Sequence, residues 1–286
     1  SDEGRMVGAS YNTAWINDNA LYLMDMRKPK EERTLLKMNP NSSMKMVPVV
    51  NSEKISKSIL SAVGRTDTSM YIEWPSSFSS TGNHGIYFFE EDIYMLDVPN
   101  ESYRRITNTK SEEKAARFSP DGKKISFVRE NDIYIYDIRT QKEKRITFSG
   151  SETNLNGTVS WVYWEEIFGR KDLGYWWSDD SKAIAFLNTD ESEVTKMHYV
   201  HWKPAESELI TQRYPKAGTK NPVVKLGIIE LTSSKLKWVD LDPFEYLCRV
   251  KWLPGNKRLS VQTMNRAQDK LDLFFVDRAT GKNVKK

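Results

Sequence analysis

The feature that most constrains the fold of this sequence is a repeated unit made of an aromatic residue, a tight turn and two short alternating strands. Its clearest copy covers residues 118–137, where the sequence Pro-Asp-Gly follows Phe118-Ser119. Proline presets φ and glycine tolerates positive φ, so this tripeptide favours a reversal of the chain. After the turn, Ile125 and Phe127 alternate with polar residues, which is the period of a half-buried strand. A chain built from such units is all-β.

Related units recur along the chain, each led by an aromatic residue: Trp15, Trp74, Phe118, Trp177 and Trp252. The shortest spacing, from Trp74 to Phe118, is 44 residues, and a four-stranded propeller blade needs about 40–50 residues. The longer spacings leave room for insertions. We therefore predict a β-propeller of four-stranded antiparallel blades, of which about five lie in residues 1–286. A run of unrelated β-hairpins is the alternative.

The composition is that of a soluble globular protein, with 38% hydrophobic and 29% charged residues. Positive and negative side chains are interspersed and leave a formal net charge of +4. Nucleic-acid-binding proteins more often cluster one sign of charge, so we expect no nucleic-acid partner. No stretch reaches the roughly 18 apolar residues that span a bilayer. The sequence contains no phosphate-binding loop and no cluster of metal ligands, so we expect no cofactor and no metal.

Four residues, the three histidines and the cysteine, are interpreted as structural. His198 and His201 are three apart in a segment that reads as a strand, where they point to opposite faces and cannot pair on a metal. His84 is predicted to be solvated in a turn. Cys248 is the single cysteine, so no intrachain disulfide can form, and it is predicted to be a small core residue.

One segment, residues 159–177, interrupts the repeat. It holds four of the nine tryptophans and the adjacent carboxylates Glu165 and Glu166. Because Gly169 bounds the Glu-Glu-Ile-Phe sequence, we predict a short helix inserted into a blade around Glu165-Glu166. A Glu-Glu dipeptide by itself is usually part of a solvated surface.

From about Phe118 to Lys225 the chain resembles the dipeptidyl peptidase IV family of the prolyl oligopeptidase class. The matching motifs are Trp161-Val162-Tyr163, Glu165-Glu166, Trp176-Trp177-Ser178, and the loop Tyr-Pro-Lys-Ala-Gly with its Asn-Pro in residues 214–225. The resemblance implies an eight-bladed propeller that gates access to an active site. It also implies that Glu165 and Glu166 bind the free N-terminal amine of a peptide substrate, while Tyr214 to Pro222 form a structural loop.

The amine-binding role agrees with the chemistry of the residues. An α-ammonium group has a pKa of about 7.7–8.0 and is mostly charged at neutral pH. Carboxylates accept short, strong hydrogen bonds from such a group. The family also uses an arginine from a preceding loop to hold the substrate's carbonyl. The corresponding residues here, 108–114, offer only lysines, and Trp164 stands where many members have a third acidic residue.

The sequence contains no Gly-x-Ser-x-Gly nucleophile motif, so we assign no catalytic residue to this chain. The resemblance implies that serine, aspartate and histidine lie in a C-terminal α/β-hydrolase domain, which is absent from residues 1–286. The chain is therefore expected to be an incomplete N-terminal propeller, inactive alone, whose open flanks expose aromatic residues such as Trp15 and Phe274.

The preferred interpretation is a propeller segment of a serine-type dipeptidyl aminopeptidase. Its partners would be peptides with a free N-terminus and its own catalytic domain, and a homodimer is compatible with the resemblance. The alternative is a non-enzymatic propeller that serves as a protein-interaction scaffold, since one fold hosts many functions. Ser1–Arg5 lack the apolar core of a signal peptide but could remain after its removal. A periplasmic or secreted location is favoured over a cytoplasmic one.

Overall fold

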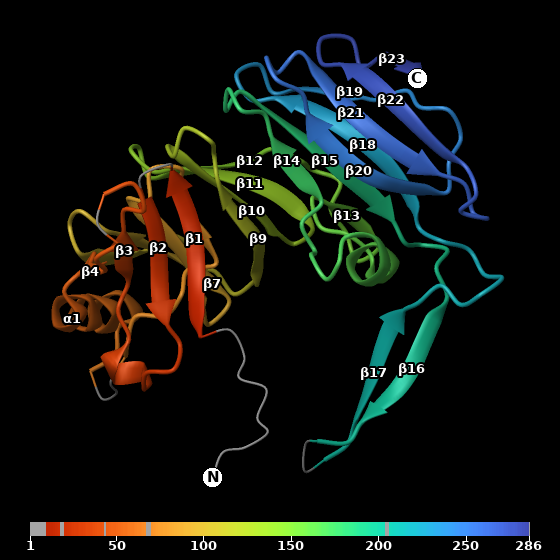
Figure 1. The fold of residues 1–286 in the computed structure, drawn as a ribbon. Coiled ribbons are helices and arrows are strands. Elements are labelled where there is room, and N and C mark those ends of the chain that lie inside the picture. Colours follow the sequence, from red (N-terminus) through yellow and green to blue (C-terminus); the bar gives the residue numbers. More distant parts are fainter. Residues whose placement is uncertain (1–9, 18–19, 43, 67–69, 204–205, 286) are drawn as a thin grey trace. The chain divides into compact units, whose positions relative to one another are not determined.

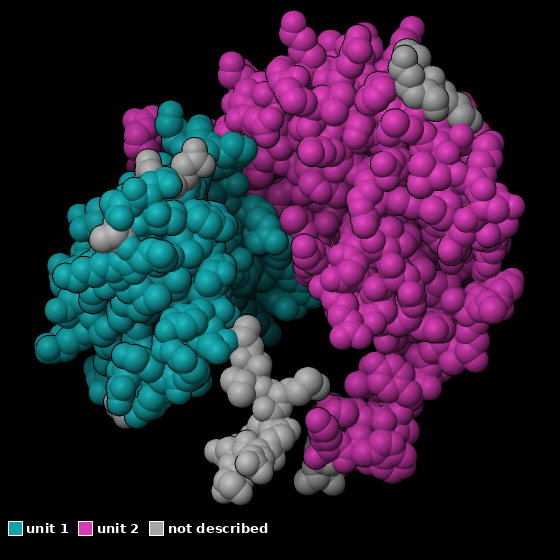
Figure 2. All heavy atoms as spheres, viewed as in Figure 1, with its two compact units in different colours: residues 1–123 teal, residues 124–286 magenta. Residues whose placement is uncertain are grey.

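The computed structural model describes residues 10–17, 20–42, 44–66, 70–203 and 206–285. Ser1–Arg5, on which the expectation about a signal peptide rests, lie outside this part. The chain divides into two compact units, residues 1–123 and 124–286 (Figure 2), and each is described by itself. No helix within the described ranges is long and apolar enough to cross a membrane.

Unit 1 contains two four-stranded antiparallel sheets (Figure 1). The first is β1 (Tyr11–Asn17), β2 (Ala20–Asp25), β3 (Leu36–Met38) and β4 (Val47–Pro48), and the second is β5 (Ser77–Phe78), β6 (His84–Phe89), β7 (Asp92–Asp97) and β8 (Ser102–Arg105). In each sheet the strands pair in chain order, which is the meander of a propeller blade. The unit also holds the short 3-10 helix η1 (Lys30–Glu32), the helix α1 (Ser52–Val63) and the strand β9 (Glu113–Phe118).

Unit 2 is built from antiparallel strands in the same way. Its first strands are β10 (Lys124–Arg129), β11 (Asp132–Asp137) and β12 (Lys142–Arg145). One sheet contains β13 (Asn154–Asn156), β14 (Tyr175–Trp177), β15 (Ala183–Asp190), β18 (Val223–Glu230) and β19 (Lys235–Trp238), and a separate hairpin contains β16 (Lys196–His201) and β17 (Glu208–Arg213). The last sheet contains β20 (Tyr246–Trp252), β21 (Arg258–Met264), β22 (Leu271–Asp277) and β23 (Asn283–Lys285). The predicted all-β architecture of four-stranded antiparallel sheets is confirmed, with one sheet enlarged to five strands by β14.

The repeated turns fix the hairpins. Asp92 pairs with Phe89 and Asp132 pairs with Arg129, so two residues connect the strands in each case. Both connecting residues have positive φ, 51° and 60° at Glu130 and Asn131. Such turns match the right-handed twist of paired strands.

A buried aspartate at the start of the second strand explains the recurring Arg-Ile-Thr sequence. Asp132 forms an ion pair with Arg145 and accepts a hydrogen bond of 2.6 Å from Thr147 Oγ1. The same threonine hydroxyl accepts a hydrogen bond from the Ile133 amide at 2.8 Å. In unit 1, Asp92, Arg105 and Thr107 repeat the ion pair and the threonine–amide bond. In each repeat the arginine therefore pairs with the buried aspartate, and the threonine accepts a hydrogen bond from the backbone amide that follows this aspartate at the start of β7 or β11.

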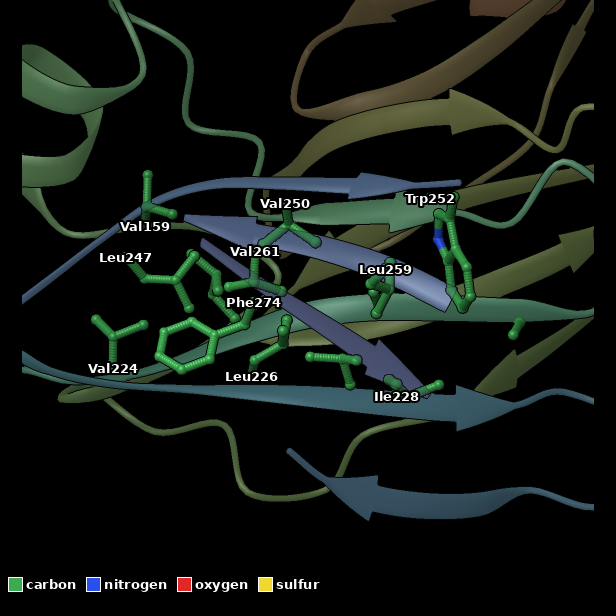
Figure 3. Packing of buried hydrophobic residues seen from close by; sticks show 14 of the residues in the cluster. Val159, Val224, Leu226, Ile228, Leu247, Val250, Trp252, Leu259, Val261 and Phe274 are labelled. Carbon is green, nitrogen blue, oxygen red and sulfur yellow. The ribbon is translucent and has the colours of Figure 1, made fainter. Parts of the chain in front are cut away.

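The core of unit 2 lies between two of its sheets (Figure 3). Alternate residues of β15 and β18 pack against β20, β21 and β22. Phe274, which we predicted to be exposed at an open flank, is fully buried in this cluster. That prediction is wrong because β22 is an inner strand of its sheet and Phe274 lies on the face that meets β18. Trp15 of β1 is 67% exposed.

Unit 1 contains a helix that the sequence analysis did not predict. The side chain of Asn51 accepts a hydrogen bond of 2.9 Å from the Lys54 amide and caps the start of α1. Gly64 ends the helix with φ of 71°. Ile55 and Ile59, one turn apart, bury the same face in the core of unit 1.

His84 also differs from its prediction. It is the first residue of β6, and its side chain is only 24% exposed, with Nε2 4.0 Å from Asp97 Oδ2. Burial lowers the pKa of His84 below its ordinary value. This residue is therefore half-buried in a strand and not solvated in a turn.

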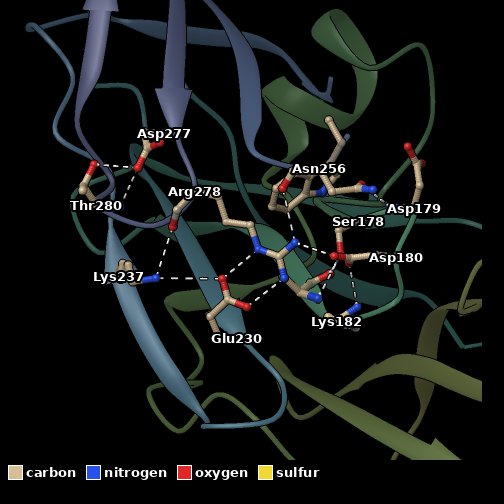
Figure 4. A network of polar contacts seen from close by, with 12 residues as sticks. Ser178, Asp179, Asp180, Lys182, Glu230, Lys237, Asn256, Asp277, Arg278 and Thr280 are labelled. Atoms are coloured by element: carbon tan, nitrogen blue, oxygen red, sulfur yellow. Dashed lines mark hydrogen bonds and ion pairs between the residues drawn. The ribbon is translucent and has the colours of Figure 1, made fainter. Parts of the chain in front are cut away.

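One arginine connects three elements of unit 2 (Figure 4). Arg278 donates two hydrogen bonds of 2.8 Å to the Glu230 carboxylate, and a third of 2.8 Å to Asp180. All three side chains are less than a third exposed. The hydrogen bonds from Arg278 hold the pKa of Glu230 below its ordinary value. This network ties the turn before β15 and the end of β18 to the end of β22.

We predict that Arg278→Met lowers the free energy of unfolding by about 2 kcal/mol at pH 7, since Asp180 loses its ion-pair partner and Glu230 keeps, among the described residues, only Lys237, at 3.8 Å. The contribution should be complete above the unfolded pKa of about 4.3 and disappear as the pH falls through the lower folded pKa of Glu230. Denaturant unfolding of both proteins between pH 7 and pH 3 measures the difference. Lys251→Met, at an exposed position of β20, is the control. A difference that does not shrink at acid pH would contradict this account.

Candidate functional site

The carboxylates singled out in the sequence lie on a single turn of π-type helix, η2 (Tyr163–Ile167), drawn in green in Figure 1. The Phe168 amide donates to the Tyr163 carbonyl at 2.8 Å, the i to i+5 bond that defines such a turn. Gly169, with φ of 60°, follows the turn and allows the chain to leave it in a left-handed conformation. The predicted short helix around Glu165-Glu166 is therefore present. Turns of π type are rare and occur frequently at functional sites.

Tyr163 fixes the start of the turn. Its side chain is fully buried in the core of unit 2, and the Phe168 ring packs edge-on at 5.8 Å between centroids. The Tyr163 hydroxyl accepts a hydrogen bond of 3.0 Å from the backbone amide of Leu247. Burial raises the pKa of this phenol well above its ordinary value, so the hydroxyl stays neutral.

A β-bulge supplies the partners of the turn. The pairing of β20 with β21 shifts register between Leu247 and Arg249, so Cys248 is an extra residue in the strand. Arg249 Nη1 donates hydrogen bonds to the Ile167 carbonyl at 2.9 Å and to the Cys248 carbonyl at 2.8 Å. The bulge therefore contacts the turn at both ends, through Leu247 at Tyr163 and through Arg249 at Ile167.

The two carboxylates have different surroundings. Glu165 Oε1 is 3.0 Å from Arg170 Nη2, with side-chain exposures of 24% for Glu165 and 76% for Arg170. An ion pair with so exposed a partner contributes little energy and exchanges readily with water. Glu166 is exposed, and the structure records no ion pair for it among the described residues.

Glu166 lines a pocket of about 430 Å³. The other lining residues are Val162, Ile167, Tyr246, Cys248, Arg249, Gln262, Met264 and Gln268. They come from the turn, from the bulge of β20, and from the end of β21 with the loop after it. A carboxylate, a guanidinium, two amides and a phenol thus meet a few apolar side chains, a combination that suits a small polar ligand.

The second segment of the family resemblance contacts the first. The Tyr214 ring packs on Trp161 at 4.4 Å between centroids. Asn221 Nδ2 donates to the Tyr246 hydroxyl at 3.0 Å and to Glu245 at 2.7 Å. Residues 214–222 therefore pack on Trp161, just before the turn, and hydrogen-bond to Tyr246 at the pocket, which agrees with the structural role predicted for this loop.

The remaining candidates are placed as follows. Cys248 is part-exposed at the bulge and not a core residue, because the extra residue of a bulge leaves the alternation of the strand. Burial still raises the pKa of its thiol. His198 and His201 lie in β16 as predicted, and His198 Nδ1 is 2.8 Å from Thr211 Oγ1. No group of three or more possible metal ligands occurs within the part of the chain that the structure describes.

Sequence reasoning missed Arg249, Tyr246 and Gln262. No motif marks them, and Arg249 follows a register shift in β20 that the sequence does not reveal. One side of the pocket around Glu166 thus comes from a motif that is visible in the sequence, and the other comes from a bulged strand that the sequence does not reveal.

Comparison with known proteins agrees with the family resemblance. The family model described as the dipeptidyl peptidase IV (DPP IV) N-terminal region matches residues 77–286. A protein of Emericella nidulans named "Probable dipeptidyl peptidase 4" is 27% identical over 264 residues, covering 88% of this chain and 33% of that protein. Dipeptidyl aminopeptidase B of Saccharomyces cerevisiae is 31% identical over 137 residues, covering 45% of this chain and 16% of that protein.

A solved structure gives the same result. The crystal structure of Porphyromonas gingivalis dipeptidyl peptidase 4 matches with a TM-score of 0.78 and 25% identity, over 99% of this chain and 40% of that chain. This chain therefore spans well under half the length of the relatives that it matches. Since the family model covers more than half of its residues, the chain belongs to the dipeptidyl peptidase IV family and forms part of that family's N-terminal region.

Proposed function

We propose that this chain is the amine-binding and access-gating propeller part of a serine-type dipeptidyl aminopeptidase. In this proposal Glu165 and Glu166 bind the free α-ammonium of a peptide and thereby set the cut after its second residue. The observation that carries the proposal is that Glu166 lines an open pocket, next to Glu165, on a turn held at both ends by β20.

The electrostatics of the turn support this role. Glu166 has no recorded ion pair in the described residues, and the partner of Glu165 is a mostly exposed arginine. An incoming ammonium can therefore donate hydrogen bonds to both carboxylates at little cost, because the Glu165–Arg170 pair is weak. A fixed pair of acceptors restrains the orientation of the cation as well as its position.

The remaining parts of the proposal concern the whole protein. We infer that the four-stranded sheets are blades of an eight-bladed ring and that a C-terminal α/β-hydrolase domain supplies the serine, aspartate and histidine. The share of the relatives that this chain covers, 33% of one and 40% of another, supports a longer protein. Peptides with a free N-terminus are the proposed substrates, and we propose a periplasmic or secreted location and a homodimer for the complete enzyme.

Replacing both carboxylates tests the amine site. Glu165→Gln with Glu166→Gln keeps the shape of the side chains and removes their charge. In the complete enzyme the double variant should lose about 2–5 kcal/mol of transition-state binding, measured as kcat/KM on a dipeptide reporter with a free amine. Glu208→Gln, an exposed residue of β17, is the control. Unchanged kcat/KM in the double variant would exclude the assignment.

Blocking the substrate amine tests the same contact from the other side. An acetylated N-terminus has no charge and adds bulk where the ammonium binds. We expect the complete enzyme to cleave a free dipeptide reporter and to reject its N-acetyl form in a steady-state assay. Equal rates would instead favour an acylaminoacyl peptidase or an endopeptidase.

A further inference from the structure

The pocket beside the carboxylate turn holds two opposite charges. Glu166 and Arg249 both line it, although they come from segments about eighty residues apart in the chain. Its volume of about 430 Å³ lies within the range of small-ligand sites. A pocket with an anion and a cation suits a ligand that carries both a cationic and an anionic group.

The charge of Arg249 is not neutralised by a carboxylate among the described residues. Its recorded hydrogen bonds go through Nη1 to two backbone carbonyls, Ile167 O and Cys248 O. A guanidinium has five N–H donors in a planar fork. Because Nη1 makes both structural bonds, the other donors remain for a ligand, and a carboxylate matches their geometry best.

The rest of the pocket suits a side chain with a polar end. Val162, Ile167 and Met264 provide apolar contacts for methylene groups. Gln262 and Gln268 add amide groups that can donate to oxygen atoms. The α-carbon of a peptide's first residue carries both the ammonium and the side chain. An ammonium bound at Glu166 therefore leaves the first side chain beside this pocket.

Resting on the proposed amine site, we propose that this pocket selects the side chain of the substrate's first residue, and that Arg249 binds its carboxylate. The preferred substrates are then peptides that begin with glutamate. Peptides that begin with lysine are disfavoured, since their second cation would meet Arg249. Arg249 thereby has two roles. Its Nη1 holds the turn, and its remaining donors bind the carboxylate of the substrate's first residue.

The test uses the full-length protein and a series of dipeptide reporters that differ only in the first residue: Glu, Gln, Ala or Lys. For the unmodified enzyme, kcat/KM for the Glu reporter should exceed that for the Ala reporter by about tenfold or more, the value of one charged hydrogen bond. In Arg249→Met this ratio should fall towards one. The Glu-to-Ala ratio tests the proposal even if Arg249→Met also loosens the turn, because a loosened turn lowers kcat/KM for every reporter.

A second pair of variants leaves the turn untouched. Gln262→Lys adds a cation to the pocket and should raise the Glu-to-Ala ratio, whereas Gln262→Glu should lower it and favour the Lys reporter. A ratio that is the same in the unmodified enzyme, Arg249→Met and both Gln262 variants would overturn the proposal. The proposal is also overturned if Arg249→Met lowers kcat/KM by the same factor for all four reporters while the Gln262 variants leave the Glu-to-Ala ratio unaltered. Arg249 would then have a purely structural role.

The failure of this inference can be told from failure of the amine site. If free reporters are cleaved and N-acetyl reporters are rejected while the ratios do not respond, only the selectivity of the pocket is wrong. If the N-acetyl Ala reporter is cleaved as fast as the free one, the amine site itself is wrong, and the inference fails with it.

Discussion

The hydrogen bond from the Leu247 amide to the buried hydroxyl of Tyr163 is the contact on which the candidate site depends. Leu247 lies directly before the bulge at Cys248, where the register of β20 shifts against β21. The same bulge lets Arg249 bond the Ile167 carbonyl at the other end of the turn. A π-type turn is rarely stable in isolation. Here it is held between a buried aromatic ring and a neighbouring strand, so the positions of Glu165 and Glu166 follow from the packing of the core and not from local helix propensity.

That packing is itself maintained by contacts far from the turn. β20 belongs to the cluster in which β15 and β18 meet β21 and β22, and the Arg278 network ties the ends of these strands together. Protein interiors are close-packed and transmit strain, so a change in this cluster would reach the bulge. Glu166 is exposed at the pocket, and Glu165 is part-buried beside Arg170. The groups that hold the turn are the buried hydroxyl of Tyr163 and the exposed guanidinium of Arg249, which bonds to backbone carbonyls.

Much of the fold was predictable because its signals are local. The Pro-Asp-Gly turn and the Arg-Ile-Thr sequence act within a few residues, and the structure contains both. The strand predicted after Lys124 is present as β10, but it is buried on both faces and not half-buried, because its polar residue Ser126 is itself buried and accepts a hydrogen bond from Trp177 Nε1. Helix α1 was missed although Asn51 and Gly64 cap it. Phe274 was misplaced because which face of a strand is covered depends on another sheet. Arg249 could not be predicted, since a register shift depends on the partner strand. The Glu pair was visible only as part of a longer motif, because two adjacent glutamates carry no signal alone.

In the proposed function, the turn held by Leu247 and Arg249 of β20 presents two carboxylates to a peptide's amino terminus. The most direct measurement is a crystal structure of the full-length protein with a dipeptide inhibitor that carries a free amine. We expect the ammonium nitrogen to lie within hydrogen-bond distance, about 2.7–2.9 Å, of carboxylate oxygens from both Glu165 and Glu166, with the Tyr163–Leu247 bond intact. An ammonium bound elsewhere, with both carboxylates still in water or paired to Arg170, would contradict it.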